Sequence, residues 1–144
     1  MILVDANLLI YAKSRGSDYH EPARRWLEQT IDLGARVGLP WPSLLAFLRI
    51  TTNPRIFERP LRPADAWDQV EEWLALGNTW VPAPTEQHPA LLGSLFRSIS
   101  VGGNLVPDAH LAALAMEHGL ELLSTDTDFA RFPGLRWRNP LAAA

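Results

Sequence analysis

The sequence predicts an α/β fold in which a mainly parallel sheet is covered by helices on both faces. The run from Ile2 to Val4 has no polar break, which suits a strand buried on both faces. Short aliphatic runs then alternate with longer amphipathic segments along the whole chain, as strands and crossover helices do. The prolines stand at helix starts and loop ends, so they mark the boundaries between the expected strands and helices.

Turn and capping residues delimit the expected elements of the first half of the chain. Gly34 stops an amphipathic helix, Pro42 opens another, and Asn53 ends that one because the residue before a proline leaves the helical region. The helix that Pro42 opens is apolar on nearly every side, so we expect it to be buried. In order, we expect a helical turn over 8–12, a helix over 19–33, a strand over 36–40 and a helix over 42–51.

The same signals delimit the second half. Pro63 occupies the first turn of a helix that Gly77 ends, and Trp67 and Trp73 belong to its apolar face. Gly119 stops a later helix. In order, we expect a helix over 63–76, a strand over 79–81, a helix over 85–98, a glycine-containing loop over 98–104, a helix over 107–118, a strand over 120–124, a polar turn over 125–129 that leads into a short helical piece, and a last strand over 135–138.

Length and composition limit the class of protein. The 144 residues suit one domain, which we place at 1–140, followed by a frayed tail over 141–144. There is no cysteine, so disulfides and thiolate metal sites are excluded. The apolar start carries Asp5 and no preceding basic residue, which does not fit a signal peptide, and no apolar run is long enough to cross a bilayer. We therefore expect a cytoplasmic protein without a membrane partner.

The balance of charges constrains how the chain could bind nucleic acid. Its net charge is −3, with 13 basic residues against 16 acidic ones. A protein that holds nucleic acid by charge alone carries a basic surplus. A nucleic-acid substrate would therefore need divalent cations or a local arginine patch.

Four aspartates occupy positions that the fold would bring together. Asp5 ends the first strand, Asp126 follows the strand over 120–124, and Asp128 lies two residues further on. Asp108 stands in the first turn of the preceding helix. The carboxyl ends of parallel strands meet at one edge of a sheet, so we expect these side chains to converge there. Each also has a purely structural explanation as a helix cap, a partner of the helix dipole or a turn former.

Converging carboxylates predict a particular chemistry. Acids that meet in one crevice repel each other unless a cation lies between them. Oxygen ligands without cysteine or paired histidine favour Mg²⁺ or Mn²⁺, and such an ion generates a nucleophile from bound water at neutral pH. The pattern therefore indicates metal-assisted hydrolysis of a phosphodiester.

Four segments resemble a PIN domain, and more narrowly the VapC-type toxins of bacterial toxin–antitoxin modules: MILVDANLLIYA, WPSLLAFLRITTNPRIF, LVPDAHLAALAMEHG and LLSTDTDFARFPGL. They cover nearly the whole chain, in order. The resemblance implies an α/β/α sandwich, a Mg²⁺-dependent endoribonuclease in which Mn²⁺ can substitute, a homodimer, and a cognate antitoxin whose tail covers the acidic groove. By motif match Asp5, Asp108 and Asp126 fall on metal-binding acids, and Asp128 falls on an accessory acid of the same turn.

One position departs from this family. The family usually places a glutamate in the helix after the second strand, where this chain has Ala46, and no acid occurs between Asp32 and Glu58. The departure implies weaker metal binding, one ion where the family has two, or a larger part for Asp128. It also motivates a second hypothesis, a catalytically weakened PIN-like module that binds RNA or antitoxin.

Further candidates lie around the expected crevice. Asn7, Arg49 and Arg55 are candidate substrate contacts, with solvated helix-end charge as the alternative for the two arginines. Trp41 stands between two prolines and is either a core residue or a base-stacking or interface residue. A third hypothesis, phosphoryl transfer through Asp5, needs a nearby lysine, but Lys13 is the only lysine and lies on the helix that leads away.

Overall fold

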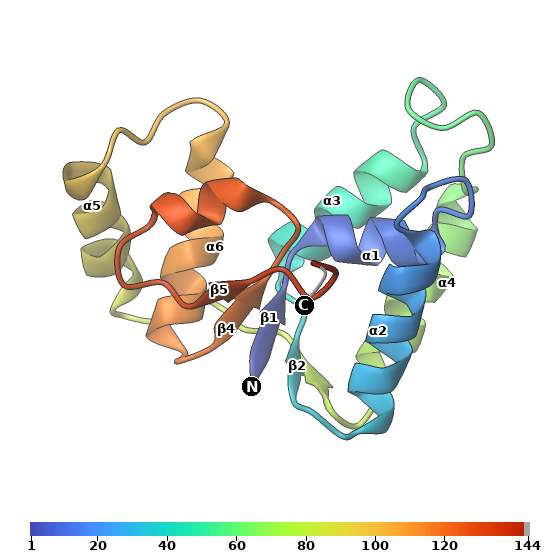
Figure 1. The fold of residues 1–144 in the computed structure, drawn as a ribbon, viewed down its shortest axis with the longest axis horizontal. Coiled ribbons are helices and arrows are strands. Elements are labelled where there is room, and N and C mark those ends of the chain that lie inside the picture. The colour runs from blue at the N-terminus through green and yellow to red at the C-terminus, as the bar shows by residue number, and fades with distance from the viewer. Residues whose placement is uncertain (143–144) are drawn as a thin grey trace.

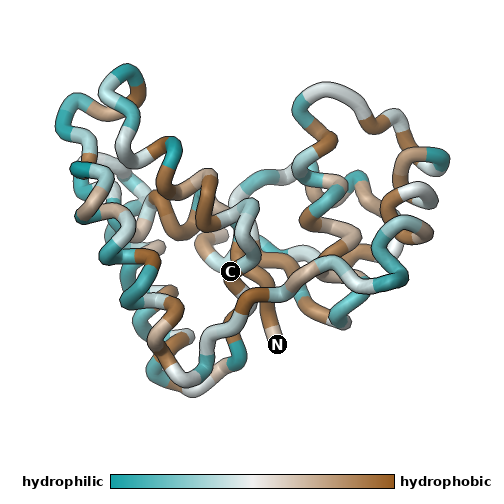
Figure 2. The backbone as a smooth tube through the Cα atoms, turned by 180° about the vertical axis from the view of Figure 1, so that it is seen from behind, coloured by the Kyte–Doolittle hydropathy of each residue, from teal (hydrophilic) through white to brown (hydrophobic). Residues whose placement is uncertain are grey.

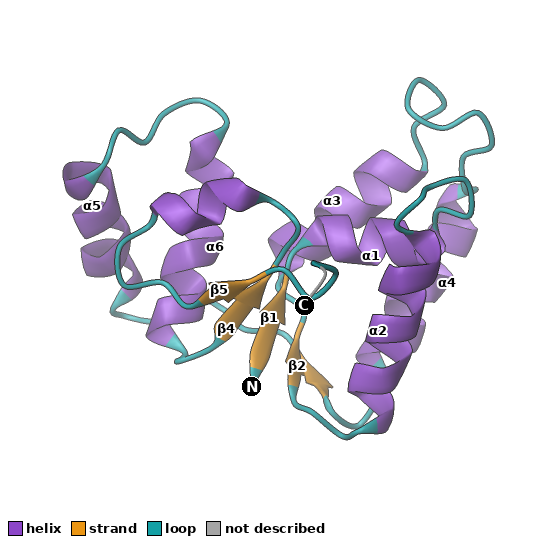
Figure 3. Ribbon diagram, viewed as in Figure 1, coloured by secondary structure: helices purple, strands orange, loops and turns teal. Residues whose placement is uncertain are grey.

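A five-stranded parallel sheet forms the centre of the molecule, which a computed structural model describes over residues 1–142 (Figures 1 and 3). The strand order is β3-β2-β1-β4-β5 and every neighbouring pair is parallel. The strands are β1 (Ile2–Val4), β2 (Val37–Gly38), β3 (Thr79–Trp80), β4 (Glu121–Leu123) and β5 (Trp137–Arg138). All five predicted strand positions are therefore confirmed, and each strand is shorter than or equal to the predicted range.

The helices cover both faces of the sheet, so the molecule is an α/β/α sandwich, as predicted. They are α1 (Ala6–Lys13), α2 (His20–Asp32), α3 (Trp41–Thr51), α4 (Pro63–Leu74), α5 (His88–Ser98), α6 (Leu105–Glu117) and the 3₁₀ helix η1 (Thr127–Arg131). Figure 1 shows α5 and α6 on one side of the sheet and α1 to α4 on the other.

Alternating strand residues divide the interior into two cores. Leu3 and Leu122 pack with α5 and α6, whereas Val4 and Leu123 pack with the layer of α1 to α4. Successive side chains of a strand point to opposite faces, so a strand covered on both faces must be apolar throughout. Figure 2 shows the result, with hydrophobic positions running through the strands and hydrophilic ones on the outer parts of the helices.

Helix α5 begins three residues after its expected start, and α6 begins two residues before its expected start. Helix α5 begins at His88, because Thr85 starts a turn in which its hydroxyl accepts a hydrogen bond from the Gln87 N–H. Helix α6 begins at Leu105, two residues before Pro107, because the preceding turn already bonds the Leu105 N–H to the Gly102 carbonyl. Pro107 and Asp108 remain in the first turn of α6, so the predicted position of the acid is unchanged.

The prediction that the helix over 42–51 is buried is wrong for one face. Phe47 is fully buried, but Leu45 is 57% exposed. Trp41, which precedes the predicted helix and begins α3, is 41% exposed and so is not a core residue. On α4, Trp73 is buried as expected, whereas Trp67 is 41% exposed. An apolar pattern on every side could not say which face lacks a neighbour, because that depends on how far α3 and α4 cover one another.

The end of the chain is only partly described. Leu141, the first residue of the predicted tail, packs against the core on the α1 side, and its N–H donates to Asn139 Oδ1 at 3.0 Å. The rest of that prediction concerns residues 143–144, which lie outside the described range. Over residues 1–142, no helix combines the length and apolarity needed to cross a bilayer.

Candidate metal centre

The predicted acids lie at the point where the strand order of the sheet reverses. Strands β2 and β3 extend the sheet on one side of β1, and β4 and β5 extend it on the other. Val4 pairs with Leu123, so Asp5 and the turn after β4 leave the sheet side by side, and the Asp5 N–H donates to the Leu123 carbonyl at 3.0 Å. In open α/β sheets, ligands bind outside the carboxyl ends of the strands at such a reversal.

Three of the acids form a close cluster. Asp108, Asp126 and Asp128 each offer a carboxylate oxygen, and these oxygens lie within 4.8 Å of one another. Asp108 comes from the first turn of α6, whereas Asp126 caps η1 by accepting a hydrogen bond from the Asp128 N–H at 2.9 Å. That bond fixes Asp126 and Asp128 relative to each other, so the turn presents both carboxylates toward α6.

Asp5 lies beside this cluster, held by its own hydrogen bonds. Its Oδ1 accepts from the Ala6 N–H at 2.8 Å, and its Oδ2 accepts from the Ser124 hydroxyl at 2.7 Å. Asp5 is therefore the N-cap of α1 and faces the site at the same time, so the two interpretations open from the sequence are compatible. It is not one of the three acids whose oxygens lie within 4.8 Å.

Ser124 connects the acids, and the sequence reasoning missed it. Its side chain is completely buried directly after β4. The hydroxyl donates to Asp5, and it accepts from Asn7 Nδ2 at 3.0 Å and from the Asp126 N–H at 3.0 Å. One donor and two acceptors are all that a hydroxyl has, so its capacity is fully used. A serine between an apolar strand and a T-D turn was the available signal, because a hydroxyl there must find partners once it is buried.

Asn7 is engaged inside the site. Its Nδ2 donates to Ser124 and its Oδ1 accepts from the Thr125 N–H at 3.4 Å. Both ends of the amide therefore join α1 to the turn after β4. This placement indicates a positioning residue, and the predicted contact with substrate stays a prediction.

Burial and mutual repulsion shape the acidity of the site. Burial, followed by the charges of Asp5, Asp126 and Asp128, raises the pKa of Asp108 to about 6. Burial also raises the pKa of Asp5, although the hydrogen bonds from Ser124 and Ala6 oppose that effect. Asp126 raises the pKa of Asp5 further. The four acids thus act as one electrostatic unit, and a cation among them would relieve their repulsion.

The residues present fit a hard divalent cation. The cluster offers carboxylate oxygens only, which suits Mg²⁺ or Mn²⁺. Helix α3 adds no acid, because Ala46 stands on it as a partly buried residue packed against the core. The ligands available to an ion therefore come from β1, α6 and the turn after β4.

The structure does not join the two candidate arginines to this cluster. Arg49 lines a groove between α3 and α4. Arg55 is exposed in the connection after α3, where its N–H donates to Asn53 Oδ1. Across residues 1–142 neither arginine forms an ion pair with the acids, so their role as substrate contacts stays a prediction.

The structure offers no lysine to the third hypothesis. Lys13 stands at the C-terminal end of α1, whereas Asp5 caps the N-terminal end of the same helix. A phosphoryl-transfer site on Asp5 would therefore have no nearby lysine from this chain.

Comparison with known proteins adds independent findings. A family model for the PIN domain matches residues 2–135. The chain is 44% identical to Ribonuclease VapC37 of Mycobacterium tuberculosis over 142 residues, covering 99% of each protein. It is 39% identical to Ribonuclease VapC33 of the same species, covering 98% of this chain and 99% of that protein.

Two solved structures share the fold. VapBC2 of Rickettsia felis, bound to a DNA fragment from its promoter, matches with a TM-score of 0.69 and 16% identity, over 96% of this chain and 98% of that one. VapC20 of Mycobacterium tuberculosis, described as a toxin that cleaves the sarcin–ricin loop, matches with a TM-score of 0.69 and 17% identity. The match covers 94% of this chain and 99% of that one.

Proposed function

The chain belongs to the PIN domain family, and from that premise we propose that it is the toxin of a toxin–antitoxin pair, an endoribonuclease that hydrolyses RNA phosphodiesters with a divalent metal ion. Membership of the family and the α/β/α fold confirm the predictions made from the sequence. The close relatives VapC37 and VapC33 are named ribonucleases and align along their whole length, which supports the same activity here.

The observation that carries the proposal is the crowding of carboxylates at the strand edge. Asp108, Asp126 and Asp128 bring their oxygens within 4.8 Å, and the pKa of Asp108 is raised to about 6. Such repulsion is costly in a structural turn, but it is useful in a site that binds a cation. We expect these three residues, with Asp5 beside them, to hold Mg²⁺ or, in its place, Mn²⁺. When bound, such an ion neutralises phosphate charge and lowers the pKa of a bound water.

The remaining features of the site are the groups that position the carboxylates and the ionisation of Asp108. Ser124 and Asn7 fix the position of Asp5 relative to the turn that carries Asp126, so that the two carboxylates lie on the same side of the site. Asp128 is the exposed member of the cluster, and it would complete the shell of the ion or orient the attacking water. Asp108 is ionised above pH 6, so the site would be ready for a cation at neutral pH.

The proposed partners follow from the family. Several structures that share the fold are VapBC or FitAB assemblies, among them VapBC of Salmonella typhimurium and FitAB, both bound to DNA. We therefore propose a cognate antitoxin that presents a basic side chain to the acids, an RNA substrate, and a homodimer that acts in the cytoplasm.

Cleavage of a structured RNA tests the activity. Wild-type protein with Mg²⁺ or Mn²⁺ should cleave, EDTA should abolish cleavage, and Asp108→Asn or Asp126→Asn should reduce the rate by about 100-fold or more. Asp18→Asn is the matched control, because Asp18 is an exposed acid in the connection between α1 and α2. A wild-type cleavage rate equal to that of Asp108→Asn would refute the proposal that the chain is an enzyme.

Ala46 favours a second candidate, a weakened PIN domain that binds RNA or antitoxin without efficient cleavage. Helix α3 supplies no acid to the site, so the metal has fewer anionic ligands than the family usually offers. RNA retention on a filter separates the two. The second candidate predicts that wild type and Asp108→Asn retain RNA equally and that neither cleaves it.

A further inference from the structure

One arginine stands beside the acids of the candidate metal centre. Arg131 is the last residue of the 3₁₀ helix η1, and its Nη1 lies 3.9 Å from Oδ1 of Asp128. Over residues 1–142, this is the only ion pair that any of the four acids forms. A basic group therefore borders a site whose carboxylates suit a cation.

The geometry of η1 places Arg131 at this position. A 3₁₀ helix has three residues per turn, so side chains at i and i+3 lie one above the other. Phe129 and Phe132 form one such pair, and both are buried in the core that includes α6. Asp128 and Arg131 form the other pair, and about half of each side chain is exposed. Burial of the two phenylalanines therefore sets the face of the turn on which the arginine stands.

The contact with Asp128 leaves the guanidinium available to another ligand. The next two arginines in the sequence, Arg136 and Arg138, each donate a hydrogen bond to the protein. Within the described part of the chain the Arg131 side chain donates none, and its contact with Asp128 is long at 3.9 Å. Exposed ion pairs contribute little to stability, so a better acceptor can replace Asp128 at small cost.

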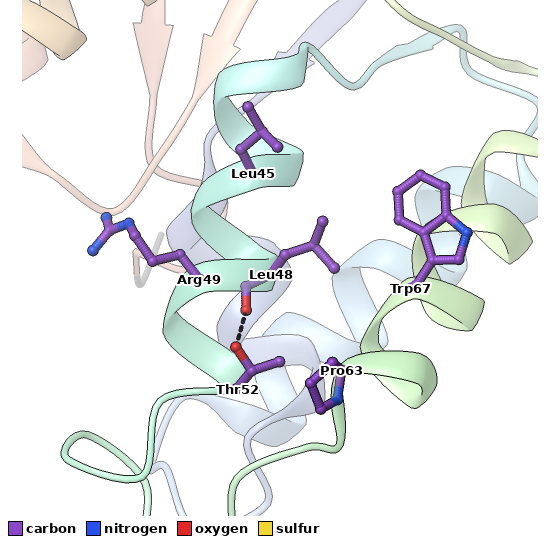
Figure 4. Close-up of a pocket in the computed structure, with 6 residues that line it drawn as sticks. All are labelled: Leu45, Leu48, Arg49, Thr52, Pro63 and Trp67. Atoms are coloured by element: carbon purple, nitrogen blue, oxygen red, sulfur yellow. Dashed lines mark hydrogen bonds between the residues drawn. The ribbon is translucent and has the colours of Figure 1, made fainter.

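The two arginines considered from the sequence are placed differently. Arg49 lines the groove between α3 and α4 and points to the opposite side of α3 from Trp67 (Figure 4). Arg55 is exposed in the connection after α3. Among the arginines of residues 1–142, Arg131 is thus the one that forms an ion pair with the acid cluster.

We propose that Arg131 binds a phosphate of the RNA backbone at the acid cluster, an inference that rests on the proposed ribonuclease activity. Carboxylates repel an approaching phosphate, and a chain of net charge −3 has no general basic surplus to offset that repulsion. A guanidinium beside Asp128 supplies positive charge at the site itself, and its planar fork fits two phosphate oxygens. Asp128 is its partner in the free protein, and the phosphate would take that place.

The salt dependence of RNA binding tests the contact apart from cleavage. The probe is the structured RNA of the cleavage assay with a fluorescent label, and anisotropy is measured with Mg²⁺ in the Asp108→Asn background, where cleavage is slow. Arg131→Gln should weaken binding by about tenfold and lower the slope of log K against log[salt] by about one. Arg131→Lys should keep the slope and lose part of the affinity, because lysine keeps the charge without the fork.

Arg25→Gln is the matched control. It removes the same charge from an exposed position on α2, a helix that contributes no residue to the site, so affinity and slope should stay nearly unchanged. Calorimetric titration of Mn²⁺ into proteins that retain Asp108 tests a purely structural role. A residue that only positions Asp128 would weaken Mn²⁺ binding when it is replaced. We expect Arg131→Gln to bind Mn²⁺ as tightly as the wild type or slightly more tightly, because a positive charge has left the site.

Two results would overturn the inference alone. One is a wild type that cleaves RNA while Arg131→Gln binds RNA as well as Arg25→Gln does, which leaves the proposed activity standing. The other is weaker Mn²⁺ binding by Arg131→Gln with an unchanged salt slope, which would make Arg131 a positioning residue for Asp128. A wild type that neither binds nor cleaves RNA would refute the proposed function, and this inference with it.

Discussion

At the scale of one residue, Asp108 lowers the stability of the metal-free protein at neutral pH. Its pKa is raised to about 6 from 3.8, so the folded chain binds a proton more tightly than the unfolded chain does. Between those two values the folded state holds more protons, and stability therefore falls as the pH rises. Without a cation, ionised Asp108 opposes folding at neutral pH.

Asp108→Asn should therefore stabilise the metal-free protein at pH 7.5. We expect a gain of about 1 kcal/mol, less than the full pKa shift implies, because Asp108 is only partly buried and solvent screens its charge. The gain should shrink as the pH falls through 6 and vanish near pH 4, where Asp108 is protonated in both states. Urea unfolding in EDTA at pH 7.5, 6 and 4 measures it, with Asp18→Asn as the control. A gain that does not depend on pH would contradict this explanation.

Ser124→Ala should damage the site without removing an acid. The substitution leaves Asp5, Asn7 and the Asp126 N–H each without one partner in a buried setting. We expect a loss of about 1–3 kcal/mol in stability and a lower cleavage rate at saturating metal. Ser98→Ala is the control, because the Ser98 hydroxyl bonds the Ser94 carbonyl on an exposed stretch of α5. Equal stability of the two variants in urea would show that the Ser124 hydroxyl does not hold the acids.

At the scale of elements, a buried polar chain holds α5 on α6. His88 of α5 is hydrogen-bonded through Nδ1 to Glu117 and through Nε2 to His110 Nδ1, both of which belong to α6. Burial alone would raise the pKa of Glu117, but the bonds from His88 and Thr85 hold it below its usual value. These contacts fix α6, the helix that carries Asp108, at His110 close to the acid and at Glu117 at the other end of the helix.

Strand β2 depends on the absence of a side chain at Gly38. A Cβ there would lie 2.8 Å from Pro82 Cγ and 3.1 Å from the Ile2 carbonyl, both closer than normal contact. Gly38→Ala should cost about 1–3 kcal/mol and lower the melting temperature by several degrees. Gly16→Ala, where nothing lies within 4 Å, should change the melting temperature little. Equal melting temperatures for the two variants would show that β2 moves to accept the methyl group.

The positions of the elements were predictable because each begins and ends on a local signal. Aliphatic runs, helix-opening prolines and glycines at helix ends depend only on neighbouring residues. The starts of α5 and α6 were less predictable, because a hydroxyl–backbone turn at Thr85 and a glycine turn at Gly102 compete with helix formation.

At the scale of the whole molecule, the order of the strands creates the site. The strand order reverses between β1 and β4, so residues more than a hundred positions apart in sequence meet at one edge of the sheet.

The sequence by itself determined the α/β alternation, the family and the acids Asp5, Asp108, Asp126 and Asp128, because periodicity and motif spacing are properties of the chain. Only the tertiary structure decided which of these carboxylates lie within 4.8 Å and that Ser124 ties Asp5 to Asp126. It alone decided that Leu45 and Trp67 remain exposed. The physical reason is that hydrogen-bond partners and exposure depend on neighbours distant in sequence, which no local pattern records.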